Sequence, residues 1–86
     1  MRRDAEVEEK IGVIAVIIED FDSVERVNEL LHEHRDCIVG RLGLPFKEEK
    51  IAVISLVLKA TAEKINALSG KLGMLKGVSC KAFLNK

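Results

Sequence analysis

The stretch that decides the fold is Lys10–Ile18, KIGVIAVII, which returns forty residues later as Lys50–Leu58, KIAVISLVL. Four of the nine positions are identical. Arg26–Leu30 is matched in a similar way by Lys64–Leu68. A repeat of this length predicts two copies of one supersecondary unit. Because each copy opens on a run of β-branched apolar residues, each unit is expected to begin with a strand.

A helix is expected after each of these strands. In the first unit Asp22 is the predicted N-cap, and Glu25, three residues later, completes a capping box. In the second unit Thr61 is the predicted cap, and Gly70 and Gly73 are expected to end the helix. The apolar residues at helical spacing are Val24, Val27, Leu30 and Leu31 in the first unit and Ala62, Ile65, Leu68 and Leu72 in the second.

Two shorter strands, residues 37–42 and 78–84, are expected to follow the helices. Residues 43–49 are predicted as a turn, and residues 1–9 as a flexible tail before a single domain over residues 10–86. The order βαββαβ predicts an α+β, ferredoxin-like sandwich. It has a four-stranded antiparallel sheet of order 4-1-3-2 with two helices on one face.

Both central strands are apolar on both sides, although two helices can cover only one face of the sheet. An uncovered face of this kind exposes several hundred square ångströms of aliphatic surface, which is typical of an interaction site. The simplest partner is a second copy, so we expect a homo-oligomer, a dimer or a tetramer, that associates through the open sheet face. The residues predicted for this interface are Val13, Ile14, Val16, Val53, Ile54 and Leu56.

The densest group of metal-ligating residue types is His32, His34 and Cys37. His32 and His34 are two residues apart, which on a helix directs them to different sides, whereas His34 and Cys37 share a helical face. The spacing favours a solvated helix end over a metal site, and these three residues stay the candidate ligands. No nucleophile–base pair is apparent, so we expect neither an enzyme nor a bound cofactor.

Composition and charge exclude several classes of protein. The chain has 86 residues with fourteen basic and fourteen acidic side chains, so its zero net charge argues against direct nucleic-acid binding. Ile11–Ile18 is the longest uncharged apolar run and is too short to span a membrane. Met1–Glu6 contains no apolar stretch, so no signal peptide is expected. Two cysteines do not make a disulfide framework, and with no export signal expected we predict a cytoplasmic protein. Cys37 and Cys80 are expected at opposite sheet edges, too far apart for a disulfide.

The sequence resembles a known family from Lys10 to Leu84. The most distinctive stretches are Gly40–Gly43, GRLG, and Leu68–Gly73, LSGKLG. They are similar to the iron-only hydrogenase system regulators, small bacterial proteins with an ACT-like, ferredoxin-like domain related to the C-terminal domain of the nickel-responsive repressor. The resemblance implies a regulatory function. Because the one fold uses the whole sequence, we do not expect the DNA-binding domain of those repressors.

The resemblance also implies a small-effector site near a subunit interface, in the loop between the first strand and the first helix. In this chain the loop residues are Asp20, Asp22 and Ser23. The loop is acidic and lacks glycine, which argues against binding of an amino-acid carboxylate.

We therefore expect a small non-enzymatic regulatory module that oligomerises through its sheet and binds a small effector. Two alternatives stay open. One is a metal-responsive regulator that uses His and Cys ligands. The other is a dimeric α+β-barrel enzyme, in which two paired sheets would have to enclose a polar cavity; the aliphatic strands argue against such a cavity.

Overall fold

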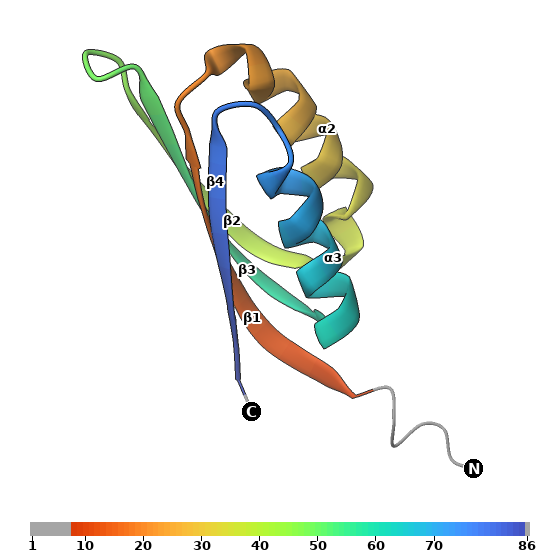
Figure 1. Cartoon of the computed structure of the whole chain (residues 1–86). Helices are drawn as coiled ribbons and strands as arrows, with labels where there is room; N and C mark the ends of the chain where they lie inside the picture. The colour runs from red at the N-terminus through yellow and green to blue at the C-terminus, as the bar shows by residue number, and fades with distance from the viewer. Residues whose placement is uncertain (1–7, 86) are drawn as a thin grey trace.

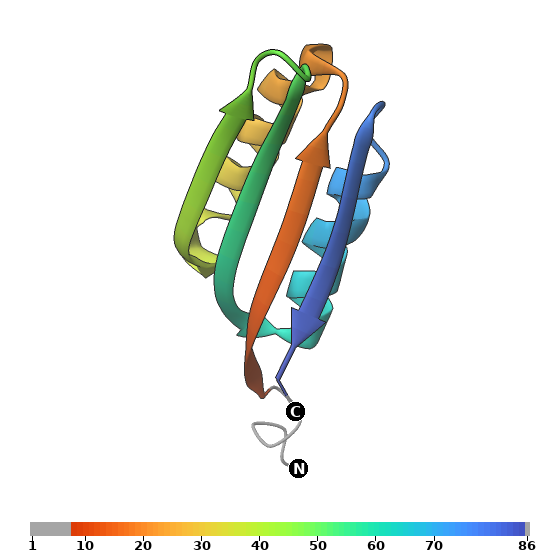
Figure 2. The ribbon, with the colours of Figure 1, turned by 90° about the vertical axis from the view of Figure 1, so that its left-hand side faces the viewer.

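Two long central strands organise the sheet. In the computed structural model, which describes residues 8–85, β1 (Glu9–Ile18) and β3 (Ile51–Thr61) pair antiparallel along the whole of β1. β4 (Val78–Leu84) pairs with the other side of β1, and β2 (Ile38–Phe46) pairs with β3. The resulting order, β2-β3-β1-β4, confirms the predicted arrangement, and Figure 2 shows the four strands from the side that no helix covers.

Both helices lie on one face of this sheet (Figure 1). A 3₁₀ turn, η1 (Phe21–Ser23), leads into α2 (Val24–Glu33), and a second, η2 (Arg35–Cys37), leads from α2 to β2. α3 (Ala62–Gly73) connects β3 to β4 and packs over β4 and β1. The architecture is the predicted ferredoxin-like α+β sandwich.

The core lies between the helices and the sheet. Along β1 every second residue from Gly12 to Ile18 is buried, and the residues between them are exposed. Gly12 permits a close approach of α3, because a Cβ atom there would lie 3.0 Å from Ile65 Cδ1 and 3.2 Å from the Phe83 carbonyl oxygen. The buried apolar residues are Ile14, Val16, Ile18, Val27, Leu30, Leu31, Ile54, Leu56, Leu58, Ala60, Ile65, Leu68, Leu72 and Val78.

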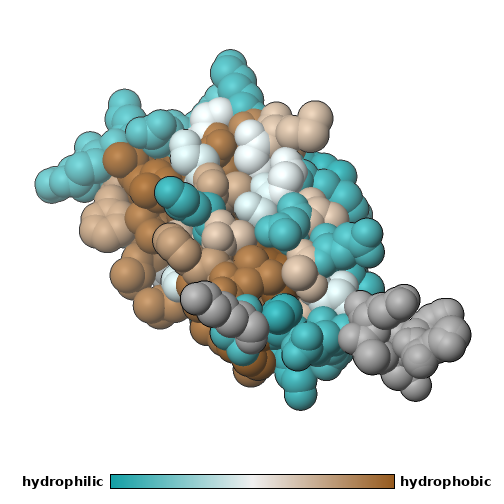
Figure 3. Space-filling model, turned by 60° about the horizontal axis from the view of Figure 1, so that its bottom comes forward, coloured by the Kyte–Doolittle hydropathy of each residue, from teal (hydrophilic) through white to brown (hydrophobic). Residues whose placement is uncertain are grey.

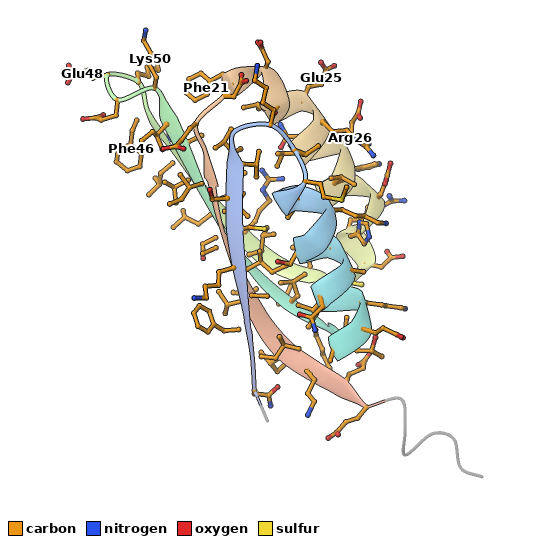
Figure 4. The ribbon with its side chains drawn as sticks, in the orientation of Figure 1. Phe21, Glu25, Arg26, Phe46, Glu48 and Lys50 are labelled. Carbon is orange, nitrogen blue, oxygen red and sulfur yellow. The ribbon has the colours of Figure 1, made fainter. Side chains whose placement is uncertain are left out.

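The strand expected over residues 37–42, which is β2, is longer than predicted. β2 continues to Phe46, which pairs with Ile51, and the turn is reduced to residues 47–50. Pro45 lies within the predicted turn, but a proline is tolerated in β2 because β2 is an edge strand of the sheet. Glu48 and Lys50 mark the tip of the resulting β2–β3 hairpin, which curves away from the helices (Figure 4).

The helix ends differ from the prediction in part. Asp20, not Asp22, is the capping residue of the first unit: its Oδ1 accepts a hydrogen bond of 2.9 Å from the Asp22 backbone N–H and begins η1. The predicted cap at Thr61 is confirmed by a 3.2 Å bond from the Lys64 N–H to Thr61 Oγ1. Gly70 does not end α3, which continues through it to Gly73.

The predicted tail, residues 1–9, can be compared with the structure only at its last two residues. Residues 1–7 lie outside the described residues. Glu9, which the prediction placed in the tail, is the first residue of β1 and pairs with Thr61.

Candidate functional site

The principal surface of the molecule is the sheet side opposite the helices, which we call the open face. Strand register places its residues in rows across the sheet. One row joins Leu44 of β2, Val53 of β3 and Ile17 of β1, and a second joins Val57, Val13 and Phe83. The full set is Ile11, Val13, Ala15, Ile17, Leu42, Leu44, Phe46, Ile51, Val53, Ser55, Val57, Lys59, Ser79, Lys81 and Phe83.

The open face is strongly apolar and exposed. Leu42 is 59% exposed and Phe83 62%, far above the values of the aliphatic side chains on the other side of the sheet. In Figure 3 brown hydrophobic surface follows the sheet side of the molecule, on the left of the view, whereas the right side is mostly hydrophilic or neutral. Phe46 extends this surface toward the hairpin tip (Figure 4). Among residues 8–85, the rest of the fold leaves this face uncovered.

The open face has raised and low regions because its side chains differ in size. Ser55 and Ala15 pair with each other between the two apolar rows and form a low trough. A shallow depression of about 290 Å³ extends from Ala15 and Ile17 to Ser79 and Lys81. Large aliphatic side chains therefore stand on both sides of a strip of small ones.

The predicted interface residues divide between the two faces of the sheet. Val13 and Val53 lie on the open face. Ile14, Val16, Ile54 and Leu56 are buried beneath the helices, at 0%, 0%, 7% and 0% exposure. Their assignment to the open face is wrong, because the helices pack on that side of β1 and β3 and make these four side chains core.

Two of the three predicted effector residues, Asp20 and Ser23, make side-chain contacts within the fold. Asp20 caps η1 and its Oδ2 lies 3.7 Å from Lys76 Nζ. Ser23 is buried, and its Oγ donates a 2.6 Å hydrogen bond to the Lys76 carbonyl oxygen. The Glu19 N–H donates a 2.7 Å bond to the Gly77 carbonyl oxygen. Asp22 is exposed in η1. The loop after β1 is thus fastened to the α3–β4 loop.

The candidate metal ligands lie along one stretch but do not converge. His32 is exposed on α2, and His34 Nδ1 lies 2.8 Å from the Leu30 carbonyl oxygen. Cys37 ends η2 and packs partly against the core. Within residues 8–85, no three His, Cys, Asp or Glu side chains are placed to hold one metal ion. A site built on these residues would need ligands from outside the described part of one chain.

Sequence reasoning missed the contribution of β2 and β4 to the open face. Leu42, Leu44 and Phe46 alternate with smaller or polar residues, which is the signal of a strand with one apolar face. Gly43 and Pro45 interrupt this signal, because glycine and proline are typical of turns. On β4, Phe83 lies opposite Val13, a pairing that only the register reveals.

The two cysteines lie at opposite sides of the sheet, Cys80 on β4 and Cys37 before β2, as predicted. Cys80 Sγ lies 3.0 Å from the Ser69 carbonyl oxygen, beneath α3. None of the helices in the described part of the chain combines the length and the apolar character needed to cross a bilayer.

Known proteins of similar structure and sequence place the chain in a family. The solved structure of an uncharacterized protein, TM1266 from Thermotoga maritima, is similar to 92% of this chain and 100% of its own, with a TM-score of 0.86 and 42% identity. A "Putative nickel-responsive regulator" of Saccharolobus solfataricus is 30% identical over 67 residues, which are 78% of this chain and 50% of that protein. A protein of the same name from Saccharolobus islandicus is 25% identical over the same shares of the two chains. The chain thus spans about half the length of the curated relatives it matches.

The family assignment rests on residues 10–82, nearly the whole of the described fold. They match the family model "TM1266-like: Iron-only hydrogenase system regulator, putative", in agreement with the structural similarity to TM1266. The resemblance seen in the sequence is thereby confirmed, and this chain belongs to the TM1266-like family of that description.

Proposed function

We propose that the chain is a non-enzymatic regulatory module that associates with a second copy of itself through the open face and responds to a small effector. The observation that carries the proposal is the exposed, aliphatic open face. Its members include eight large apolar side chains that are each more than a third exposed: Ile11, Val13, Ile17, Leu42, Leu44, Phe46, Val57 and Phe83. A contiguous apolar surface of this kind on a soluble domain is typical of a protein–protein interface.

The relief of the open face supports a second copy as the partner. In an association with two-fold symmetry the same surface serves both chains, so it must be complementary to itself. The trough at Ser55 and Ala15, with Val57 on one side and Ile17 on the other, can accept an apolar row of the partner while offering its own rows in return. Burial of about 500 Å² of apolar surface contributes on the order of 12 kcal/mol before the cost of association.

The charges of the open face are compatible with this pairing. Lys59 lies opposite Ile11, toward the end of the paired strands, and Lys81 lies on the edge strand β4. A long lysine side chain at the rim of an interface can cover apolar surface with its methylene groups while its ammonium group stays in water. The central strands therefore present an uncharged middle to the partner.

Mass measurement in solution tests this association. Light scattering coupled to size-exclusion chromatography should give at least twice the 9.5 kDa of one chain at micromolar concentration. Val57→Glu places a charge on the open face without touching the core and should yield a monomer of unchanged circular dichroism. Met74→Glu is the matched control, because Met74 is 85% exposed at the end of α3, away from the open face. A wild-type monomer, or equal masses for the two variants, contradicts the proposal.

The regulated process is proposed from the family. Its description as iron-only hydrogenase system regulators supports a function in the control of that system. We infer that such regulation would act through a change in the assembly of the module or in its contacts with another protein, because the open face is an exposed apolar surface. Co-purification from the native organism, with Val57→Glu as the negative control, tests whether the open face also serves a second protein.

A metal-responsive regulator is the second candidate, favoured by the names of the curated relatives, which are called nickel-responsive. Equilibrium dialysis against Ni²⁺ provides the test, with His32→Ala, His34→Ala and Cys37→Ser as variants. Stoichiometric nickel that is lost in these variants would replace the effector proposal with this one. Absence of saturable nickel binding to the assembled protein would dismiss it.

A further inference from the structure

A cleft separates α2 from the edge strand β2, on the helix side of the sheet. It has a volume of about 370 Å³ and is lined by Asn28, Leu31, His32, Arg35, Ile38 and Arg41. A second depression of about 180 Å³ shares Asn28 and Arg41 and continues toward Pro45 and Ala52. In Figure 2 α2 is seen behind β2 and β3, with β2 at the outer edge. The cleft is separate from the open face and from the loop after β1.

Two arginines give the cleft its charge. Arg41 Nη2 donates a 3.3 Å hydrogen bond to Asn28 Oδ1, and Arg35 Nη1 donates a 2.9 Å bond to the His32 carbonyl oxygen. Among residues 8–85 neither guanidinium has a carboxylate within ion-pair distance. Each guanidinium carries five N–H donors, so most of the donors in the cleft are available to a ligand.

A third arginine, Arg26 of α2, provides a comparison because its guanidinium is paired with carboxylates. Arg26 Nη1 lies 3.1 Å from Glu29 Oε1 and 3.7 Å from Glu33 Oε2. Arg26 and Glu25 lie on the outer side of α2, away from the sheet (Figure 4). Two of the three carboxylates of α2, Glu29 and Glu33, are thus paired with Arg26, whereas Arg35 and Arg41 have no ion-pair partner among residues 8–85.

The GRLG stretch shapes the wall of the cleft. Arg41 pairs with Leu56 and Gly43 with Ile54, two buried residues, so both lie on the helix side of β2. A Cβ atom at Gly43 would meet no heavy atom within 4 Å, which means that the space beside Arg41 is open. Leu31 and Ile38 add apolar surface to the lining. Gly43 lines the second depression, which adjoins the cleft at Arg41 and Asn28, and its lack of a side chain leaves that depression open.

We propose that this cleft binds a small organic anion, whose carboxylate or phosphate group is held by Arg41 and Arg35 and whose apolar part lies against Leu31 and Ile38. Planar guanidinium groups match the oxygens of both anions and can bind them with two parallel hydrogen bonds. Two cationic side chains in one cleft disfavour a metal ion. Binding of an anion to the cleft does not require the open face. The inference rests on the proposed function only in identifying this anion as the small effector.

Titration followed by NMR provides the test, since a 9.5 kDa chain gives resolved amide spectra. The probes are phenyl phosphate, benzoate, inorganic phosphate and uncharged benzamide, at low salt. Phenyl phosphate and benzoate should saturate the protein and shift the amides of Asn28, Arg35, Ile38 and Arg41. Inorganic phosphate should bind more weakly because it lacks the apolar part, and benzamide should not bind. A preference between the first two probes identifies the anion.

Variants separate the contribution of the charged side chains to anion binding from that of the apolar lining. Arg41→Gln should weaken binding by about tenfold or more, and Arg41→Lys by less, because lysine keeps the charge but not the planar pair of donors. Ile38→Ala keeps every charge but removes apolar lining of the cleft, so it should weaken phenyl phosphate and benzoate more than inorganic phosphate. Lys71→Gln is the matched control: it removes one positive charge at the end of α3, away from the cleft.

Three results would overturn the proposal: no saturable binding of any anion at millimolar concentration, shifts outside the cleft, or binding that Lys71→Gln weakens as much as Arg41→Gln. Each titration is repeated in the Val57→Glu background. If that variant is monomeric and still binds the anion, the cleft and the self-association are independent. Failure of self-association in the wild type would leave the cleft result unaffected.

Discussion

A few residues hold the loop after β1 against the α3–β4 loop. Gly77 has a φ of 70°, and a Cβ atom there would lie 2.5 Å from the Cβ atom of Asp20. Glu19 and Ser23 donate hydrogen bonds to the carbonyl oxygens of Gly77 and Lys76. These contacts join two loops that are distant in sequence, and Asp20 and Ser23 contribute their side chains to them.

At this scale we predict that Gly77→Ala lowers the free energy of unfolding by about 2 kcal/mol or more, because it combines a left-handed backbone with a steric clash. Gly70→Ala is the opposite case. Gly70 lies inside α3 with open space around it, and alanine should raise the free energy of unfolding by about 0.5–1 kcal/mol through helix propensity. Urea denaturation followed by circular dichroism measures both. Similar midpoints for the two variants would be inconsistent with this account.

The β2–β3 hairpin shows how an element can be longer than its sequence suggests. Lys50 closes the turn with a φ of 59°, and its N–H donates a 3.2 Å hydrogen bond to the Lys47 carbonyl oxygen. Phe46 and Ile51 pair immediately outside this turn. The strand therefore persists through Pro45, and the hairpin carries Leu44 and Phe46 onto the open face.

Lys50→Gly should raise the free energy of unfolding by about 0.5 kcal/mol, because glycine adopts the left-handed conformation without the penalty of a side chain. Lys47→Gly is the control in the same turn. Lys47 is not among the residues with positive φ, so glycine there adds only conformational entropy to the unfolded chain and should destabilise. Chemical denaturation with a constant m value is the measurement, and a loss of stability in Lys50→Gly would disprove the prediction.

The whole molecule is a two-layer sandwich of helices and sheet, in which one face of the sheet is exposed to solvent. The helices shield one side of the sheet, and the open face presents aliphatic side chains from β1, β2 and β3 and the aromatic Phe83 from β4. A domain of 86 residues buries only about two thirds of its unfolded surface, so its stability alone is marginal. Association through the open face would therefore add to the stability of each chain.

At this scale the thermal midpoint of the wild type should rise with protein concentration, because association stabilises the folded state by mass action. The midpoint of Val57→Glu should be lower and independent of concentration. Differential scanning calorimetry over a hundredfold range of concentration measures both. A wild-type midpoint that stays constant over this range argues against linked folding and association.

The sequence by itself determined the order of strands and helices, the sheet topology and the family. These depend on local patterns: β-branched runs make strands, apolar residues at helical spacing make helices, and a repeated unit closes into one sheet. The cap at Thr61 belongs to the same class, since capping acts within one turn of helix.

Only the tertiary structure decided which side of the sheet became the core. In β1 and β3 both sides are apolar, so the alternation that normally separates inside from outside carries no information there. The position of the helices made Ile14 and Leu56 core and left Val13 and Val53 on the open face. The cleft at Arg41 was likewise beyond the sequence, because it depends on the distance that α2 keeps from an edge strand, a property of packing and not of any local pattern.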